Sequence, residues 1–261
     1  ETPRGQASRA FWAEAYPGHP AGRPSGGTPE SLSALPVEAI RAALARQVHR
    51  EGLLVTAAGA VTERELAELL PRLFAGLPAG APVAVPPLPE FRRFGQRVLP
   101  VDAPQSSVMF GQPGLATSDP DWEAAQVMLR ILAGGGFASR LMQAVREKRG
   151  LAYGIGAGLD TVLRQAAIVG SVATENARVA ETLAVTREEW ARMAAEGPTD
   201  EEMADAVAYL TGSLPLQFAD SRRVSDGLLA LRQNDRPPDW LAGRPERLAA
   251  LGRGRVAAVA K

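Results

Sequence analysis

The chain has 261 residues, of which 46% are hydrophobic and 22% charged, so it can bury a substantial core. Its 29 basic and 29 acidic residues give a formal net charge of zero, which excludes a strong overall field toward nucleic acid or an anionic membrane. The absence of cysteine excludes disulfides and thiolate chemistry, and no apolar run approaches the roughly 20 residues that span a bilayer.

The first third of the chain predicts a helix, a short strand and a second helix. Apolar residues recur at helical spacing over residues 36–48, and we expect that face to lie in a core. The apolar run at residues 53–55 suits a strand. Thr62 and Glu65 then form a capping-box pattern at the start of a helix that continues to Phe74.

A proline-rich stretch follows, with five prolines between residues 76 and 89. So many prolines are unsuited to a regular element, and they predict an interdomain linker at residues 78–90. Beyond it we expect strands at residues 96–101 and 106–110, and then a helix over residues 119–132 with Ser118 as its cap.

The remainder continues the mixture of helices and strands. After three consecutive glycines we expect a helix over residues 139–148 and two strands over residues 151–159 and 165–172. Three more helices are predicted beyond these strands. They cover residues 176–195, a segment that begins at the cap formed by Thr199 with Glu202, and residues 221–232. Helices packed on mostly antiparallel strands indicate an α+β fold and not a regular βαβ alternation.

The sequence offers little for a metal site or a nucleophile. A catalytic zinc normally takes three protein ligands, and this chain has only His19 and His49, without H-E-x-x-H or H-x-x-E-H spacing. We therefore interpret His19 as a loop residue and His49 as a polar residue near a helix end. No G-x-S-x-G elbow, phosphate loop or complete G-x-G-x-x-G pattern is present.

A basic cluster precedes a tyrosine in the middle of the chain. By themselves, Arg140, Arg146, Lys148 and Arg149 indicate a solvated helix face, and Tyr153 indicates a packed strand aromatic. Composition alone therefore assigns no function to them.

The run GGGFASRLMQAVREKRGLAY over residues 134–153 strongly resembles the signature of the second domain of pitrilysin/insulinase-like peptidases, whose zinc motif is the inverted H-x-x-E-H. In particular it resembles bacterial members related to mitochondrial processing peptidase. Other stretches agree in order and spacing, namely AYPGHP, GTPESL, PQS, ATEN and YLTGS, which begin at residues 15, 27, 104, 173 and 209. The resemblance covers nearly the whole chain.

The resemblance implies a domain organisation. Members of the family have two similar α+β domains per subunit, and two subunits or halves close like a clamshell around a peptide chamber. Residues 1–77 would be the carboxy-terminal part of a first peptidase-like domain, and residues 91–261 a second, inactive-type domain with an antiparallel sheet. The family's zinc ligands would precede this chain, so the resemblance implies no cofactor here and zinc in a partner or a missing upstream region.

The resemblance also implies the site residues. Arg146 and Tyr153, seven residues apart, match the family's Arg/Tyr pair that reaches the zinc site of the partner domain, and they are the expected substrate-binding residues. A guanidinium can donate several hydrogen bonds to substrate carbonyls, and a phenol can stabilise the oxyanion that forms on the scissile carbonyl. Arg149 matches a family position too, and we interpret it as a helix-end cation. No catalytic residue or metal ligand is expected within this chain alone.

Three interpretations remain open. The chain is the substrate-binding, zinc-free subunit of a heterodimeric peptidase, or the later part of a complete peptidase with H-x-x-E-H upstream, or a structural core-protein-like subunit. The absent initial Met and the helix-like end RVAAVAK lead us to expect a fragment of a longer chain. Similar bacterial proteins favour the periplasm over the cytoplasm. Ala21 and Ala60 differ from the residues that the family usually has at these positions. These differences affect packing more than they affect the Arg/Tyr pair.

Overall fold

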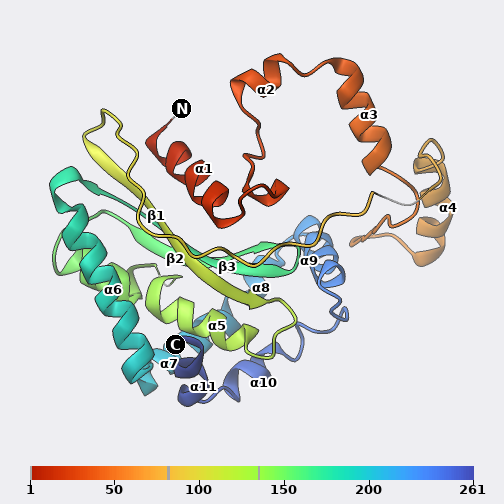
Figure 1. The fold of residues 1–261 in the computed structure, drawn as a ribbon. Helices are drawn as coiled ribbons and strands as arrows, with labels where there is room; N and C mark the ends of the chain where they lie inside the picture. The colour runs from red at the N-terminus through yellow and green to blue at the C-terminus, as the bar shows by residue number, and fades with distance from the viewer. Residues whose placement is uncertain (1, 81–82, 135) are drawn as a thin grey trace. The chain divides into compact units, whose positions relative to one another are not determined.

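The computed structural model describes residues 2–80, 83–134 and 136–261, which form two compact units (Figure 1). Unit 1 comprises residues 2–24, 88–212 and 242–261, and unit 2 comprises the described residues of 25–87 and 213–241. Each unit is thus assembled from segments that lie far apart in the sequence. The division into a first and a second peptidase-like domain at residues 78–90 stays a prediction.

Unit 1 is built on a three-stranded antiparallel sheet. Its strands are β1 (Gln105–Ala116), β2 (Ile155–Val162) and β3 (Gln165–Glu175), in the order β1-β3-β2. Val172 of β3 is aligned with Val108 of β1 on one side and with Ile155 of β2 on the other. The sheet and its packed helices confirm the predicted α+β fold.

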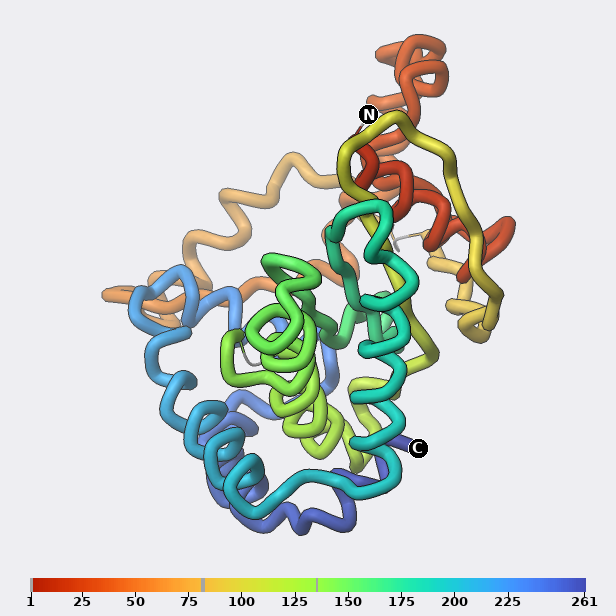
Figure 2. Tube along the Cα trace, turned by 90° about the vertical axis from the view of Figure 1, so that its left-hand side faces the viewer, coloured from red at the N-terminus to blue at the C-terminus, as the bar shows by residue number. Residues whose placement is uncertain are grey.

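Helices cover both faces of this sheet. On one face lie α5 (Trp122–Leu129), α6 (Val179–Glu196), α7 (Asp200–Gly212), α10 (Arg244–Ala249) and α11 (Arg253–Val259). The other face is covered by α1 (Pro3–Ala15), and Figures 1 and 2 show α1 and α5 on opposite sides of the strands.

Strand alternation explains this two-sided packing. Val108 and Phe110 of β1 pack into the large core beneath α5, whereas Met109 between them packs with Phe11 of α1. The centre of the large core is formed by side chains with almost no exposed surface, namely Val127, Met128, Leu132, Leu141, Val145 and Met193. The sheet is therefore the middle layer of unit 1, and its central strand β3 is the most buried of the three.

A buried ion pair joins two helical segments of unit 1. The Arg140 side chain is only 8% exposed, and its Nε and Nη2 lie 2.6 Å from the two carboxylate oxygens of Glu202. Arg140 also donates to the carbonyl oxygen of Gly197 at 2.9 Å, while the N–H of Thr199 donates to Glu202 at 2.8 Å. Burial raises the pKa of Glu202, but the hydrogen bonds from Arg140 and Thr199 outweigh it and hold the pKa below its ordinary value. The predicted cap of Thr199 with Glu202 is confirmed.

Gly170 of β3 is required by its neighbour on β1. It is aligned with Phe110, and a Cβ at this position would overlap the Phe110 ring and lie 2.8 Å from the carbonyl oxygen of Gly156. We expect Gly170→Ala to lower the free energy of unfolding by about 1–3 kcal/mol through this overpacking. The measurement is urea denaturation followed by circular dichroism.

Gly158 of β2 is the matched control, because a Cβ there would meet nothing within 4 Å. We expect Gly158→Ala to change the unfolding free energy by no more than about 0.5 kcal/mol. Equal midpoints for the two variants would contradict the proposed steric role of Gly170.

Unit 2 contains the helices predicted in the first third of the chain. The described helices are α2 (Pro29–Ser33), α3 (Val37–Gln47), α4 (Glu63–Leu73), α8 (Leu214–Gln217) and α9 (Ser221–Gln233). The capping box of Thr62 and Glu65 at the start of α4 is confirmed. Reciprocal hydrogen bonds of 2.9 Å between the hydroxyls and carbonyl oxygens of Thr56 and Ser225 tie the segment before α4 to α9.

Two predicted strands and one predicted core face are wrong. Residues 53–55 and 96–101 are not in strands, because no neighbouring strand pairs with them in the described part of the chain. The predicted core face of α3, formed by Val37, Ile40, Leu44 and Val48, is 36–62% exposed. The described residues of unit 2 contain no sheet against which this face could pack.

Smaller differences concern helix ends and helix type. Ser118 does not cap α5, whose N-cap is Asp121. The predicted helix over residues 139–148 is mostly a π-helical turn, η4 (Met142–Glu147). The helices α1, α2, α8 and α10 were not predicted. None of the helices in the described part of the chain combines the length and the apolar composition needed to cross a membrane.

Candidate functional site

The wide turn η4 carries Arg146. The N–H of Lys148 donates to the carbonyl oxygen of Gln143 at 3.0 Å, five residues earlier, which is the hydrogen-bond spacing of a π-helix. Such turns occur frequently at functional sites. The Arg146 side chain is 25% exposed at this position.

The backbone then reverses and is tied down before it reaches Tyr153. Gly150 has a φ of +56°, which glycine adopts readily, and its N–H donates to the carbonyl oxygen of Arg146 at 2.9 Å. Leu151 donates to the carbonyl oxygen of Val145 at 2.8 Å and accepts from the hydroxyl of Thr174 at 2.6 Å. These bonds hold the segment between Arg146 and Tyr153 against η4 and β3.

The structure brings Arg146 and Tyr153 into contact. The Arg146 Cζ lies 4.4 Å from the centroid of the Tyr153 ring and 4.4 Å from the centroid of the Phe137 ring. Tyr153 is 84% exposed and Phe137 61% exposed, and the Arg146 Nε lies 3.4 Å from a carboxylate oxygen of Glu147. We call these three residues, Phe137, Arg146 and Tyr153, the Arg146 cluster.

The arrangement of the Arg146 cluster favours a particular kind of ligand contact. Aromatic rings attract a guanidinium through their faces, whereas its N–H groups point outward in its plane. A peptide carbonyl or a carboxylate that approaches Arg146 in this plane can accept two N–H groups at once. Tyr153, exposed beside it, can donate its phenol hydrogen to a neighbouring oxygen.

The rest of the basic cluster divides into three environments. The Nη1 of Arg149 donates to the carbonyl oxygen of Ala144 at 3.1 Å, as expected for a helix-end cation. Arg140 is buried in its ion pair with Glu202, so its interpretation as part of a solvated helix face is wrong. Lys148 is exposed. Only Arg146 of the four contacts exposed aromatic rings.

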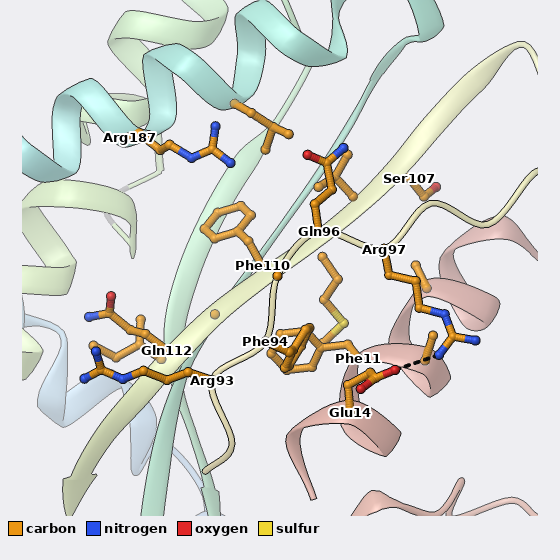
Figure 3. Close-up of a pocket in the computed structure, with 18 of the residues that line it drawn as sticks. Phe11, Glu14, Arg93, Phe94, Gln96, Arg97, Ser107, Phe110, Gln112 and Arg187 are labelled. Atoms are coloured by element: carbon orange, nitrogen blue, oxygen red, sulfur yellow. Dashed lines mark hydrogen bonds and ion pairs between the residues drawn. The ribbon is translucent and has the colours of Figure 1, made fainter. Parts of the chain in front are cut away.

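A separate groove of about 810 Å³ follows β1 between α1 and α6 (Figure 3). Its lining combines aromatic and basic side chains, including Phe11, Phe94, Phe110, Arg93 and Arg187. Arg97 also lines it, and the Arg97 Nη1 lies 2.9 Å from a carboxylate oxygen of Glu14. The groove shares no lining residue with the Arg146 cluster. Its parts are too far apart in the sequence for it to be predicted.

Comparison with known proteins assigns the chain to a family. The profile of the peptidase M16 inactive domain matches residues 34–210. An uncharacterised zinc protease of Mycobacterium leprae is 32% identical over 217 residues, which are 81% of this chain and 48% of that protein. Another of Streptomyces coelicolor is 31% identical over 254 residues, which are 92% of this chain and 54% of that protein. This chain belongs to the peptidase M16 family.

A solved M16 structure agrees with this assignment. The crystal structure of a peptidase M16 inactive domain from Pseudomonas fluorescens superposes with a TM-score of 0.83 at 25% identity, covering 98% of this chain and 62% of that one. The resemblance to pitrilysin/insulinase-like peptidases is thereby confirmed. The chain spans about half the length of the curated relatives it matches.

The names of these relatives refer to zinc, but the described residues of this chain contain no set of ligands for it. Across residues 2–80, 83–134 and 136–261, no three His, Cys, Asp or Glu side chains lie together so as to hold a metal ion. The Nδ1 of His19 accepts the N–H of Ala21 at 3.1 Å, and the Nε2 of His49 lies 2.9 Å from the carbonyl oxygen of Arg46. The described residues therefore do not fit zinc, and both histidines have local structural contacts instead.

Phe137 was not recognised from the sequence as a site residue. It directly follows three consecutive glycines and precedes Arg146 by nine residues. A helix break separates Phe137 from Arg146, so helical periodicity does not relate these two positions. Their contact is visible only in the folded loop. An aromatic residue directly after a glycine run was the one available signal.

Proposed function

We propose that this chain is the substrate-binding, zinc-free part of an M16 zinc peptidase. In this role Arg146 and Tyr153 hold the peptide, and a zinc-bearing subunit or domain hydrolyses it. The observation that carries the proposal is the contact between Arg146 and Tyr153, both presented from a backbone that is tied to η4 and β3.

Each side chain would have a distinct task. The N–H groups of Arg146 would bind a carbonyl oxygen of the peptide and fix its orientation in the chamber. The phenol of Tyr153 would donate to the oxygen of the scissile carbonyl as negative charge develops there. A rigid backbone suits both tasks, because donors placed in advance need no reorganisation during the reaction.

The length of the relatives supports a second arrangement. This chain matches only about half the length of two curated relatives named zinc proteases, so a zinc-bearing part with H-x-x-E-H would precede it in the same polypeptide. Arg146 and Tyr153 would then serve the same purpose from the later half. Zinc content and intact mass of the protein purified from its native source distinguish the two arrangements.

Tyr153→Phe tests the role of the phenol. We expect kcat of the assembled peptidase to fall at least about 10-fold and KM to change little, because the lost hydrogen bond forms in the transition state. Hydrolysis of a fluorogenic peptide by the full-length protein with its zinc-bearing partner provides the measurement.

Tyr209→Phe is the matched control, because Tyr209 is also exposed and also has an arginine, Arg130, over its ring. We expect this control to retain full turnover. An unchanged kcat for Tyr153→Phe would refute the oxyanion role and favour a purely structural subunit.

A further inference from the structure

We propose that Phe137 is a positioning residue of the peptide-binding site, which clamps the Arg146 guanidinium against Tyr153 so that its N–H edge faces the peptide. This inference rests on the proposed function of Arg146 and adds a third side chain to the pair.

The first support is that two aromatic rings contact the same guanidinium. The Phe137 and Tyr153 ring centroids lie at the same distance, 4.4 Å, from the Arg146 Cζ. Each ring attracts the cation electrostatically, and both together restrict its rotation more than either alone. The guanidinium is thereby ordered before a peptide arrives, which lowers the entropic cost of binding.

The second support is the exposure of Phe137. At 61% exposed, its ring is not held in place by burial in the core. The aromatic contact found for it in the described part of the chain is with Arg146. Core packing therefore does not explain an aromatic side chain at this position, whereas contact with Arg146 does.

The third support is the way the backbone holds Phe137. The side-chain Nε2 of Gln143, three residues before Arg146, donates to the carbonyl oxygen of Phe137 at 2.8 Å. Gly136 turns the chain with a φ of +59°, and the hydroxyl of Ser139 donates to the Gly136 carbonyl oxygen at 3.1 Å. Phe137 is thus fixed to the same turn, η4, that carries Arg146.

The clamp also determines which edge of Arg146 remains available. The guanidinium Cζ lies over both rings, and Nε lies 3.4 Å from a carboxylate oxygen of Glu147. The Nη groups are left to bind an acceptor that lies in the guanidinium plane, as a peptide carbonyl can. An arginine held in this way should therefore select its ligands by the direction from which they approach as well as by their charge.

The test compares Phe137→Leu, which keeps an apolar side chain but removes the ring, with Phe137→Trp, which keeps an aromatic face. In the full-length protein, we expect the ring-current shift of the Arg146 Hε proton to be reduced in the Leu variant, because only the Tyr153 ring remains beside the guanidinium, and retained in the Trp variant. In the assembled peptidase, kcat/KM should fall roughly 3- to 30-fold for Leu and much less for Trp.

Arg146→Ala separates failure of this inference from failure of the proposed function. An unchanged Hε shift in Phe137→Leu would overturn the clamp. A reduced shift with unchanged kcat/KM would also overturn it, provided that Arg146→Ala impairs turnover. If Arg146→Ala itself leaves turnover intact, the proposed function fails and the role of Phe137 in peptide binding fails with it.

Discussion

Replacing Arg140 with Met is expected to lower the free energy of unfolding of unit 1 by about 3–5 kcal/mol. The substitution would leave the Glu202 carboxylate partly buried without its cation, and it would remove the donor to the Gly197 carbonyl oxygen. Removing one member of a buried pair is more costly than removing both, because the remaining charge has lost its solvent and its partner. Urea denaturation followed by tryptophan fluorescence provides the measurement, since Trp12, Trp122 and Trp190, three of the four tryptophans, lie in unit 1.

Two further variants identify the cause of this loss. Arg97→Met breaks the partly exposed pair with Glu14 and should cost less than about 1 kcal/mol. Adding Glu202→Gln to Arg140→Met removes the stranded charge while an amide oxygen can still accept from Thr199, so it should recover part of the stability. If Arg97→Met and Arg140→Met cost the same, burial of the Arg140 pair is not what stabilises unit 1.

Arg146→Ala is expected to lower kcat/KM of the assembled peptidase by about 10²- to 10³-fold. The loss combines fewer hydrogen bonds to the peptide with poorer alignment of the scissile carbonyl. Arg146→Lys should recover only a small part, because an ammonium has no planar fork and cannot present a flat face to two rings at once. Steady-state hydrolysis of a fluorogenic peptide over a range of concentrations gives kcat and KM separately.

Lys148→Ala controls for the change in charge, since Lys148 is exposed two residues away and outside the Arg146 cluster. We expect it to keep kcat/KM within about twofold of the unmodified protein, as is usual for exposed positions without specific partners. An equal loss in Lys148→Ala and Arg146→Ala would mean that general positive charge, and not the geometry of Arg146, attracts the peptide.

Local chemistry was predicted well from the sequence. The capping boxes at Thr62 and Thr199 depend on residues three positions apart, and both helices begin as predicted. The hairpin of β2 and β3 likewise lies close to the predicted strands, because its partners are neighbours in the sequence. Signals of this kind need no information about distant residues.

Features that depend on distant partners were predicted poorly. The apolar runs at residues 53–55 and 96–101 have strand-like composition, but a strand forms only where another strand supplies hydrogen-bond partners. Helix α3 has the periodicity of a core-facing helix, yet periodicity does not specify what covers that face. In both cases composition describes a tendency and the tertiary partner decides the outcome.

The Arg146 cluster lies between these two cases. The resemblance to a peptidase signature indicated Arg146 and Tyr153 as site residues. Their spacing of seven residues would by itself predict a contact only if both lay on one face of a continuous helix. Here η4 ends and Gly150 turns the chain. The bonds of Leu151 to the Val145 carbonyl oxygen and the Thr174 hydroxyl then return Tyr153 to Arg146. Those bonds, like the contact with Phe137, depend on the folded loop.

The packing of α1 on the sheet affects how the chain folds during its synthesis. Tyr16, at the end of α1, belongs to the same small core as Ala167 of β3, and at about 5–20 residues per second the ribosome takes roughly 8–30 s to add the intervening segment. Until then the apolar side of α1 has no sheet to cover it. A nascent chain with an exposed aromatic helix is prone to aggregate, so this delay creates a period in which a chaperone would be needed to cover α1.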